Sequence, residues 1–140
     1  IDWESVSLWN PDWKVTAPEF EGTPKKLADF AGRKNVLQLH PFPDKKSPAS
    51  LSRKFAVPAT GKPVLSFDAA AKSGSDWELV VRVNGKEASR KSINAEGGDW
   101  KNQSVDLSPW LGQTIEIQLE NHPTGWSWEF SYWSDLKITP

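Results

Sequence analysis

The fold class is clearest in the stretch DWELVVRVNG, residues 76–85. Large apolar side chains occupy every second position from Trp77 to Val83, a period of two that is typical of a strand with one buried face. Asn84-Gly85 follows at once, and both residue types tolerate the positive φ of a tight hairpin turn. The stretch therefore predicts a strand over 77–83, a two-residue turn and a returning strand over 86–93.

The rest of the second half repeats this alternation, and further strands are predicted over 64–70, 104–107, 113–120 and 126–139. In the last of these, one face carries Trp126, Trp128, Phe130, Tyr132, Leu136 and Ile138, and the other carries Trp133 with polar residues. Short strands with one-sided alternation, separated by turns, predict an all-β jelly-roll β-sandwich of two antiparallel sheets. Ten side chains are expected in its core: Leu65, Phe67, Leu79, Val81, Val83, Ile115, Ile117, Leu119, Phe130 and Ile138.

The first half is less regular. Strands are predicted over 5–9, 36–40 and 51–57, and one or two helical turns over 24–31, where Leu27 and Phe30 share a face. The segment 108–112 is typical of a single helical turn, because a serine caps it and a proline takes its first position. No longer helix is expected.

Composition limits the class of protein. The 140 residues fit one domain, 1–140, and the net charge of −1 with interspersed signs argues against nucleic-acid binding. The absence of cysteine excludes disulfides and cysteine-based zinc sites, and no apolar run reaches membrane-spanning length. The chain begins at Ile1 without a methionine, so we expect it to be excised from a larger protein.

Tryptophan is in surplus. Nine occur beside a single tyrosine, and five of them fall in the last 41 residues. A small core needs few indoles, because each is large and carries an N–H that must find a partner. We therefore expect some of these rings to face solvent, where a flat apolar face suits stacking on sugars. The alternative is that most of them are core residues.

The segment 121–129, NHPTGWSWE, is the best candidate ligand site. Indoles can stack on sugar C–H faces, while amide, imidazole and carboxylate groups can bind hydroxyls. We expect Trp126 and Trp128 to be the platforms and Asn121, His122 and Glu129 the hydroxyl partners.

Other residues are candidates for the same site. Asp76 and Trp77, or the Trp9–Trp13 loop with Trp13, are expected to contribute. Trp133, on the outward face, is either a platform or covered by the N-terminal segment. A covered Glu129 needs a partner, and a salt bridge with Arg82 is the alternative to a ligand role.

Catalytic motifs are absent from the sequence, and we expect no enzyme. Both histidines precede prolines, and no nucleophile elbow, zinc-binding helix or phosphate loop occurs. No cofactor is expected except a candidate structural calcium ion. Asp2, Glu4 and Asp135 are its expected ligands, provided that the first and last strands pair.

Two stretches resemble a known family. Residues 100–115, WKNQSVDLSPWLGQTI, are similar to the run before the penultimate strands of galactose-binding-like jelly-roll domains. Residues 128–138, WEFSYWSDLKI, are similar to their closing strands, and DWELVVRVNG fits a central hairpin. Within that superfamily the chain looks closest to NPCBM-like carbohydrate-binding modules, over residues 36–140. The resemblance implies the same sandwich and a secreted or periplasmic bacterial protein.

Two functions remain open. The first is a non-catalytic carbohydrate-binding module that binds a neutral glycan or polysaccharide by Trp stacking and hydrogen bonds to hydroxyls. The second is an accessory or spacer domain that packs on neighbouring domains of its parent protein and binds no sugar. Solvent exposure of the indoles distinguishes them.

Overall fold

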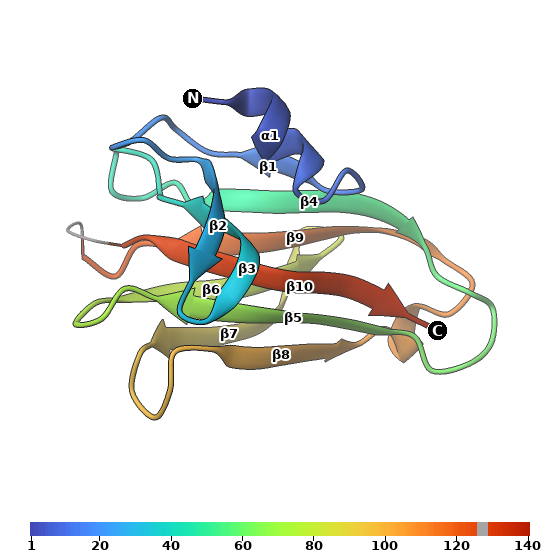
Figure 1. Cartoon of the computed structure of the whole chain (residues 1–140). Coiled ribbons are helices and arrows are strands. Elements are labelled where there is room, and N and C mark those ends of the chain that lie inside the picture. The colour runs from blue at the N-terminus through green and yellow to red at the C-terminus, as the bar shows by residue number, and fades with distance from the viewer. Residues whose placement is uncertain (126–128) are drawn as a thin grey trace.

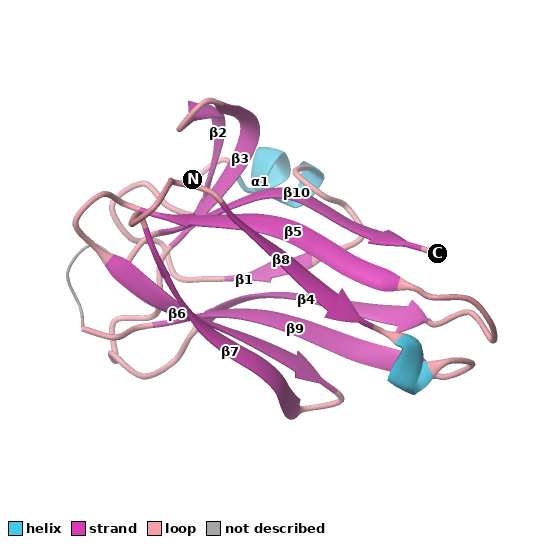
Figure 2. Cartoon of the chain, turned by 90° about the horizontal axis from the view of Figure 1, so that it is seen from below, coloured by secondary structure: helices cyan, strands magenta, loops and turns pink. Residues whose placement is uncertain are grey.

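Ten strands form two antiparallel five-stranded sheets that face each other as a sandwich (Figures 1 and 2). This computed structural model describes residues 1–125 and 129–140. The expected all-β sandwich is confirmed. The elements in chain order are α1 (Trp3–Leu8), β1 (Lys14–Thr16), β2 (Lys25–Phe30), β3 (Arg33–Leu39), β4 (Ala49–Ala56), β5 (Val64–Ala71), β6 (Asp76–Val83), β7 (Lys86–Asn94), β8 (Lys101–Asp106), the 3-10 turn η1 (Ser108–Trp110), β9 (Thr114–His122) and β10 (Ser131–Thr139).

The strand order is β1-β4-β9-β6-β7 in the first sheet and β2-β3-β10-β5-β8 in the second. The second-half strands predicted over 64–120 are confirmed as β5 to β9, with shifted ends, and the helical turn at 108–112 is confirmed as η1. The last predicted strand, 126–139, is confirmed only from Ser131 as β10: residues 129 and 130 are not in a strand, and 126–128 lie outside the described residues. Of the first-half predictions, 36–40 and 51–57 correspond to β3 and β4. Neither helix in the described ranges is long and apolar enough to span a membrane.

The prediction of a strand over 5–9 is wrong, because this segment lies mainly in the helix α1. Asp2 caps the helix: its side chain accepts a hydrogen bond from the backbone N–H of Ser5 at 3.0 Å. Glu4 lies in the first turn, where a negative charge is favourable. Both capping residues can be recognised in the sequence, but the alternation of apolar residues over 5–9 favours a strand there.

The helical prediction over 24–31 is also wrong, because most of this segment is the strand β2. Ala31 and Gly32 both have positive φ, 47° and 80°, so the chain reverses there and β2 pairs with β3. Strand pairing satisfies the backbone of β2, which overrides the weak helical spacing of its apolar side chains.

Two indoles lie at the centre of the sandwich. Trp77 from β6 and Trp133 from β10 are fully buried, with ring centroids 5.2 Å apart. The Trp77 N–H donates to the Ala70 carbonyl at 2.9 Å, and the Trp133 N–H donates to Ser131 Oγ at 2.8 Å. Because β6 and β10 belong to opposite sheets, this contact joins the two sheets.

The predicted faces of the last strand are wrong because β10 contains a bulge. Its register against β5 shifts between Ser134 and Lys137, and Asp135 has a φ of 54°. The shift puts Trp133 and Leu136 on the same, core-facing side, whereas strict alternation separates them. Tyr132 packs in a second cluster, on the outer face of the second sheet.

Apolar side chains therefore form two clusters, and all ten predicted core residues pack in one or the other. Nine belong to the cluster between the sheets, where Ile138 is partly buried at its margin. Phe130 belongs to the second cluster, which the β2–β3 hairpin covers (Figure 2). Phe30 of this hairpin stacks on Tyr132 with ring centroids 3.7 Å apart.

An ion pair fixes the hairpin across the second sheet. Arg33, at the start of β3, donates to Asp68 on β5 at 2.7 Å, and Asn102 on β8 donates to the same carboxylate at 2.9 Å. Burial alone raises the pKa of Asp68, but the hydrogen bonds from Arg33 and Asn102 outweigh it and hold the pKa below its ordinary value. Trp100 adds a hydrogen bond from its indole N–H to the Ala31 carbonyl at 3.0 Å.

We predict that Asp68→Asn lowers the free energy of unfolding at pH 7 by roughly 1–2 kcal/mol, because a buried charge-assisted hydrogen bond is lost. A lowered pKa means that folding favours the ionised carboxylate. Its contribution is therefore complete above the ordinary Asp value and is lost as pH falls through the folded-state pKa. Urea denaturation should show the difference at pH 7 and a smaller one below about pH 4.

The control for this variant is Asp135→Asn. Asp135 is exposed and has positive φ, which asparagine also tolerates, so its stability should change by less than about 0.5 kcal/mol. Equal effects of the two substitutions would contradict a specific role for the Arg33–Asp68 pair.

The predicted Asn84-Gly85 hairpin turn is confirmed, since both residues have positive φ, 51° and 79°, and Val83 pairs with Lys86. We expect Gly85→Val to lower the free energy of unfolding by about 1 kcal/mol or more. No atom lies within 4 Å of an added Cβ, so this cost reflects backbone strain alone. Lys86→Val, at the neighbouring exposed strand position, is the control. Unchanged denaturation of the Gly85 variant would refute the explanation.

Candidate functional site

A polar hollow of about 850 Å³ opens at the end of the sandwich where β5 joins β6 and β9 leads towards β10. We call it the loop-end hollow. In Figure 1 these connections lie together at one end of the molecule. Its lining combines hydroxyl, amide and carboxylate groups: Ser73, Gly74, Ser75, Asp76, Asn94, Ala95, Glu96, Thr124, Gly125 and Glu129.

Charge gives this hollow a definite chemistry. Three of its lining residues, Asp76, Glu96 and Glu129, are acidic, and none is basic. Such a lining can accept hydrogen bonds from hydroxyl groups, and it disfavours anionic ligands.

Glu129 is a structural residue of the hollow. It is buried, with 2% of its surface exposed. Its carboxylate accepts hydrogen bonds from the backbone N–H of Gly125 at 2.6 Å and from the Thr124 hydroxyl at 2.8 Å. The Thr124 backbone N–H donates to the same oxygen. Glu129 therefore satisfies the donors of the preceding loop through its Oε1 atom.

The expected Arg82–Glu129 salt bridge is wrong. Arg82 instead pairs with Glu120 at 2.8 Å, on the outer face of the first sheet. His122, another expected ligand residue, contacts the same Glu120 carboxylate at 2.9 Å. In place of a cation, backbone and hydroxyl donors of Thr124 and Gly125 stabilise Oε1 of Glu129. His122 is not among the residues that line the hollow.

Asn121, Trp77 and Trp133 are fully buried, which corrects the expectation that they contact a ligand. The Asn121 amide donates to Ser131 Oγ at 2.8 Å and to the Glu129 carbonyl at 3.2 Å. It thus connects β9 to the segment that enters β10.

The predicted platforms, Trp126 and Trp128, lie outside the described residues. The residues on either side of them are described: Gly125 and Glu129 are joined by the 2.6 Å hydrogen bond and line the loop-end hollow. Asp76, the remaining candidate nearby, is exposed and accepts a hydrogen bond from the Thr124 hydroxyl at the hollow.

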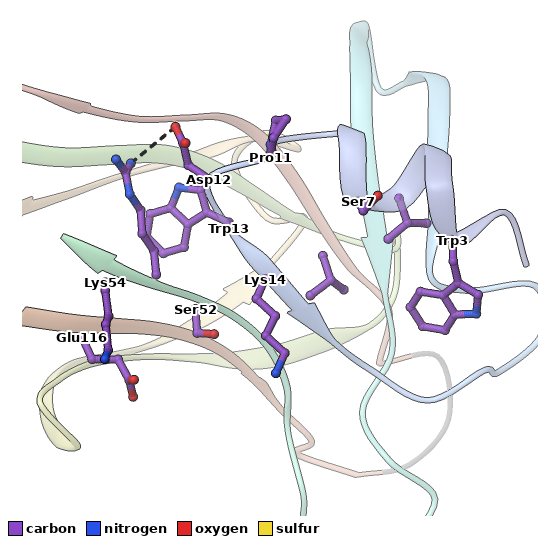
Figure 3. Close-up of a pocket in the computed structure, with 12 residues that line it drawn as sticks. Trp3, Ser7, Pro11, Asp12, Trp13, Lys14, Ser52, Lys54 and Glu116 are labelled. Atoms are coloured by element: carbon purple, nitrogen blue, oxygen red, sulfur yellow. Dashed lines mark ion pairs between the residues drawn. The ribbon is translucent and has the colours of Figure 1, made fainter.

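Trp13 lines a different cleft, beside α1 (Figure 3). The ring is almost fully buried, with 3% exposed, and it belongs to the main core cluster. It does not line the loop-end hollow.

The calcium prediction finds no support in the described ranges. Asp2 and Glu4 belong to the cap and first turn of α1, so the first segment does not pair with the last strand as the prediction required. Asp135 instead faces Lys137 at 3.3 Å. Within residues 1–125 and 129–140, no three acidic or histidine side chains gather closely enough to hold a metal ion.

Sequence analysis missed Asn94, Glu96 and Ser75 as parts of the hollow. Asn94 and Glu96 lie at or after the end of β7, and Ser75 lies just before β6. No sequence pattern indicates that these two segments meet. The predicted β6–β7 hairpin is the signal that could have located them, since pairing of Asp76 with Asn94 brings the start of β6 next to the end of β7.

Solved structures share this fold at low sequence identity. The K3 cleaved adhesin domain of Lys-gingipain from Porphyromonas gingivalis W83 is 15% identical, with a TM-score of 0.65 and 91% of each chain covered. A structure of CBM51-2 with GlcNAc and INT domains from Clostridium perfringens ZmpB is 14% identical, with a TM-score of 0.59 over 94% of this chain and 30% of that one. A CBM4 structure is 15% identical, with a TM-score of 0.55 over 94% of this chain and 88% of that one.

These similarities confirm the expected sandwich of two antiparallel sheets as a fold. A cyclase from Fischerella sp. TAU shares it too, so the fold alone does not decide function. No protein-family model matches the sequence, and no curated protein is significantly similar to it.

We predict that Glu129→Gln lowers the free energy of unfolding by about 1–2 kcal/mol, because the charge-assisted bonds to Thr124 and Gly125 weaken. Hydrogen exchange of these two backbone amides should accelerate more than exchange in the core strands. Glu116→Gln, at an exposed site on β9, is the matched control and should change neither quantity. Unaltered exchange at both amides in the Glu129 variant would show that the carboxylate does not hold this loop.

Proposed function

We propose that this chain is a non-catalytic carbohydrate-binding module that binds a neutral glycan at the loop-end hollow. The observation that carries the proposal is the hollow's lining of hydroxyl, amide and carboxylate groups. Two of the lining residues, Gly125 and Glu129, flank a stretch of the sequence that contains two tryptophans. Sugar sites combine such hydrogen-bonding groups with aromatic platforms.

We propose the following roles for the described residues of this site. The Asp76 and Glu96 carboxylates, the Asn94 amide and the Ser75 hydroxyl are the candidate hydroxyl partners. Glu129 positions the loop through its bonds to Thr124 and Gly125. Trp126 and Trp128 remain the proposed stacking platforms. The acidic lining supports a neutral glycan over an anionic one.

The fold similarity to carbohydrate-binding modules supports the same function. A single site of this kind typically binds in the micromolar to millimolar range, about −4 to −8 kcal/mol. Such affinity is useful when the module is attached to other domains, because tethering raises the effective concentration. We therefore propose an exported bacterial parent protein with further domains.

A second candidate function is an accessory domain that packs on a neighbouring domain. Its specific support is the exposure of three large apolar residues in or near α1: Ile1, Trp3 and Leu8 are 47%, 43% and 58% exposed. Large exposed apolar side chains are typical of contact surfaces when they are contiguous.

We predict that Trp126→Ala and Trp128→Ala each reduce binding of a neutral glycan about tenfold or more, since losing one platform costs roughly 1–2 kcal/mol. A panel of neutral polysaccharides in affinity electrophoresis, followed by calorimetry on the best binder, would measure this. Circular dichroism should stay native-like.

Trp3→Ala is the matched control, because Trp3 is exposed and does not line the loop-end hollow. If the wild type binds no neutral glycan, or if both loop variants unfold, the accessory-domain function replaces this proposal. If only the Trp3 variant loses binding, the site is misplaced.

A further inference from the structure

A second cleft, of about 560 Å³, lies between α1, the loop before β1 and the strand β4 (Figure 3). We call it the α1 cleft. Its lining residues come from α1, the 11–15 segment, β4 and β9, and none is shared with the loop-end hollow. Its volume is within the range of small-ligand sites in proteins.

Trp3 offers this cleft an aromatic face. Trp3 is 43% exposed, and its Nε1 donates to Glu19 Oε1 at 3.2 Å. The hydrogen bond occupies the polar edge of the indole and restrains its orientation. An exposed indole offers an apolar ring face, which suits the C–H face of a pyranose.

Trp13 supplies a second indole in the cleft lining. The Arg53 guanidinium carbon lies 5.9 Å from its ring centroid, and the side chain is almost fully buried. Its Nε1 has no hydrogen-bond acceptor among residues 1–125 and 129–140. This N–H is itself buried, so Trp13 gives the cleft a fixed apolar wall rather than a donor that a ligand can reach.

Charge distinguishes this cleft from the loop-end hollow. Three basic side chains line it, those of Lys14, Arg53 and Lys54, against two acidic ones. Arg53 is close to Asp12 at 3.9 Å. No carboxylate of the described residues forms an ion pair with Lys14 or Lys54. In Figure 3 the Lys14 side chain lies between the two indoles.

We propose that the α1 cleft is a second glycan site, selective for a sugar that carries a carboxylate or sulfate group. The sugar ring would stack on Trp3, and its anionic group would pair with Lys14. Glu116 and Ser52, also in the lining, are candidate partners for sugar hydroxyls. This site does not depend on the loop-end hollow, because the two share no lining residue.

The test is calorimetry of the whole chain with three probes: an oligogalacturonate, a chondroitin sulfate oligosaccharide and a neutral oligogalactan. We expect binding of at least one anionic probe, weakening as salt rises because the contact is electrostatic. Lys14→Gln and Trp3→Ala should each weaken it about tenfold. Lys34→Gln, an exposed lysine on β3, should leave it unchanged. Binding of the oligogalacturonate alone identifies carboxylate as the recognised group. Chondroitin sulfate carries carboxylates as well as sulfates, so its binding alone is compared with that of unsulfated chondroitin, and loss of binding without the sulfates identifies sulfate.

The proposal is overturned if neither anionic probe binds, if the oligogalactan competes equally for the cleft, or if Lys14→Gln and Trp3→Ala both leave the affinity intact. Its failure is separable from that of the proposed function, since Trp126→Ala and Trp128→Ala should not affect anionic probes. The melting temperature of each variant distinguishes a folding defect from a lost ligand contact. Because Lys14 is exposed, we expect Lys14→Gln to fold normally.

Discussion

The contact between the Trp77 and Trp133 indoles is the constraint on which the rest of the sandwich depends. The two rings come from opposite sheets and lie fully buried, 5.2 Å apart. Truncating a buried indole typically costs about 3–5 kcal/mol, since it removes a large apolar area and leaves a cavity. Both N–H groups have acceptors within the core, so the pair is buried without an unsatisfied donor.

This core is linked to the loop-end hollow through a short chain of hydrogen bonds. Ser131 Oγ accepts from Trp133 and from the Asn121 amide, and Asn121 also donates to the Glu129 carbonyl. The Glu129 carboxylate in turn holds Thr124 and Gly125. Since every partner up to Glu129 is buried, the edge of the hollow is positioned by the core itself, as a preorganised binding site requires.

The strands of the second half could be predicted because each has one buried face and a period of two, with Asn84-Gly85 marking the hairpin. The core position of Trp133 could not be predicted, because the bulge at Asp135 reverses the alternation along β10. No residue type in the preceding sequence indicates this bulge. The helical prediction over 24–31 was wrong because the segment forms the strand β2 by pairing with β3, and this pairing leaves no signal in the segment's own sequence. Of the candidate site, sequence reasoning identified the segment around Asp76 and Glu129. It did not predict that Glu129 holds the loop through Thr124 and Gly125, because such local hydrogen bonds leave no spacing pattern in the sequence.

The division of the tryptophans into structural and binding indoles is the central claim, and nuclear magnetic resonance of the indole N–H signals during a titration with a neutral glycan tests it most directly. The account predicts shifts for Trp126 and Trp128, with the amides of Asp76, Thr124 and Gly125, and none for Trp77 and Trp133. A glycan that binds while the loop-end signals stay unchanged, or that shifts the core pair first, would contradict it.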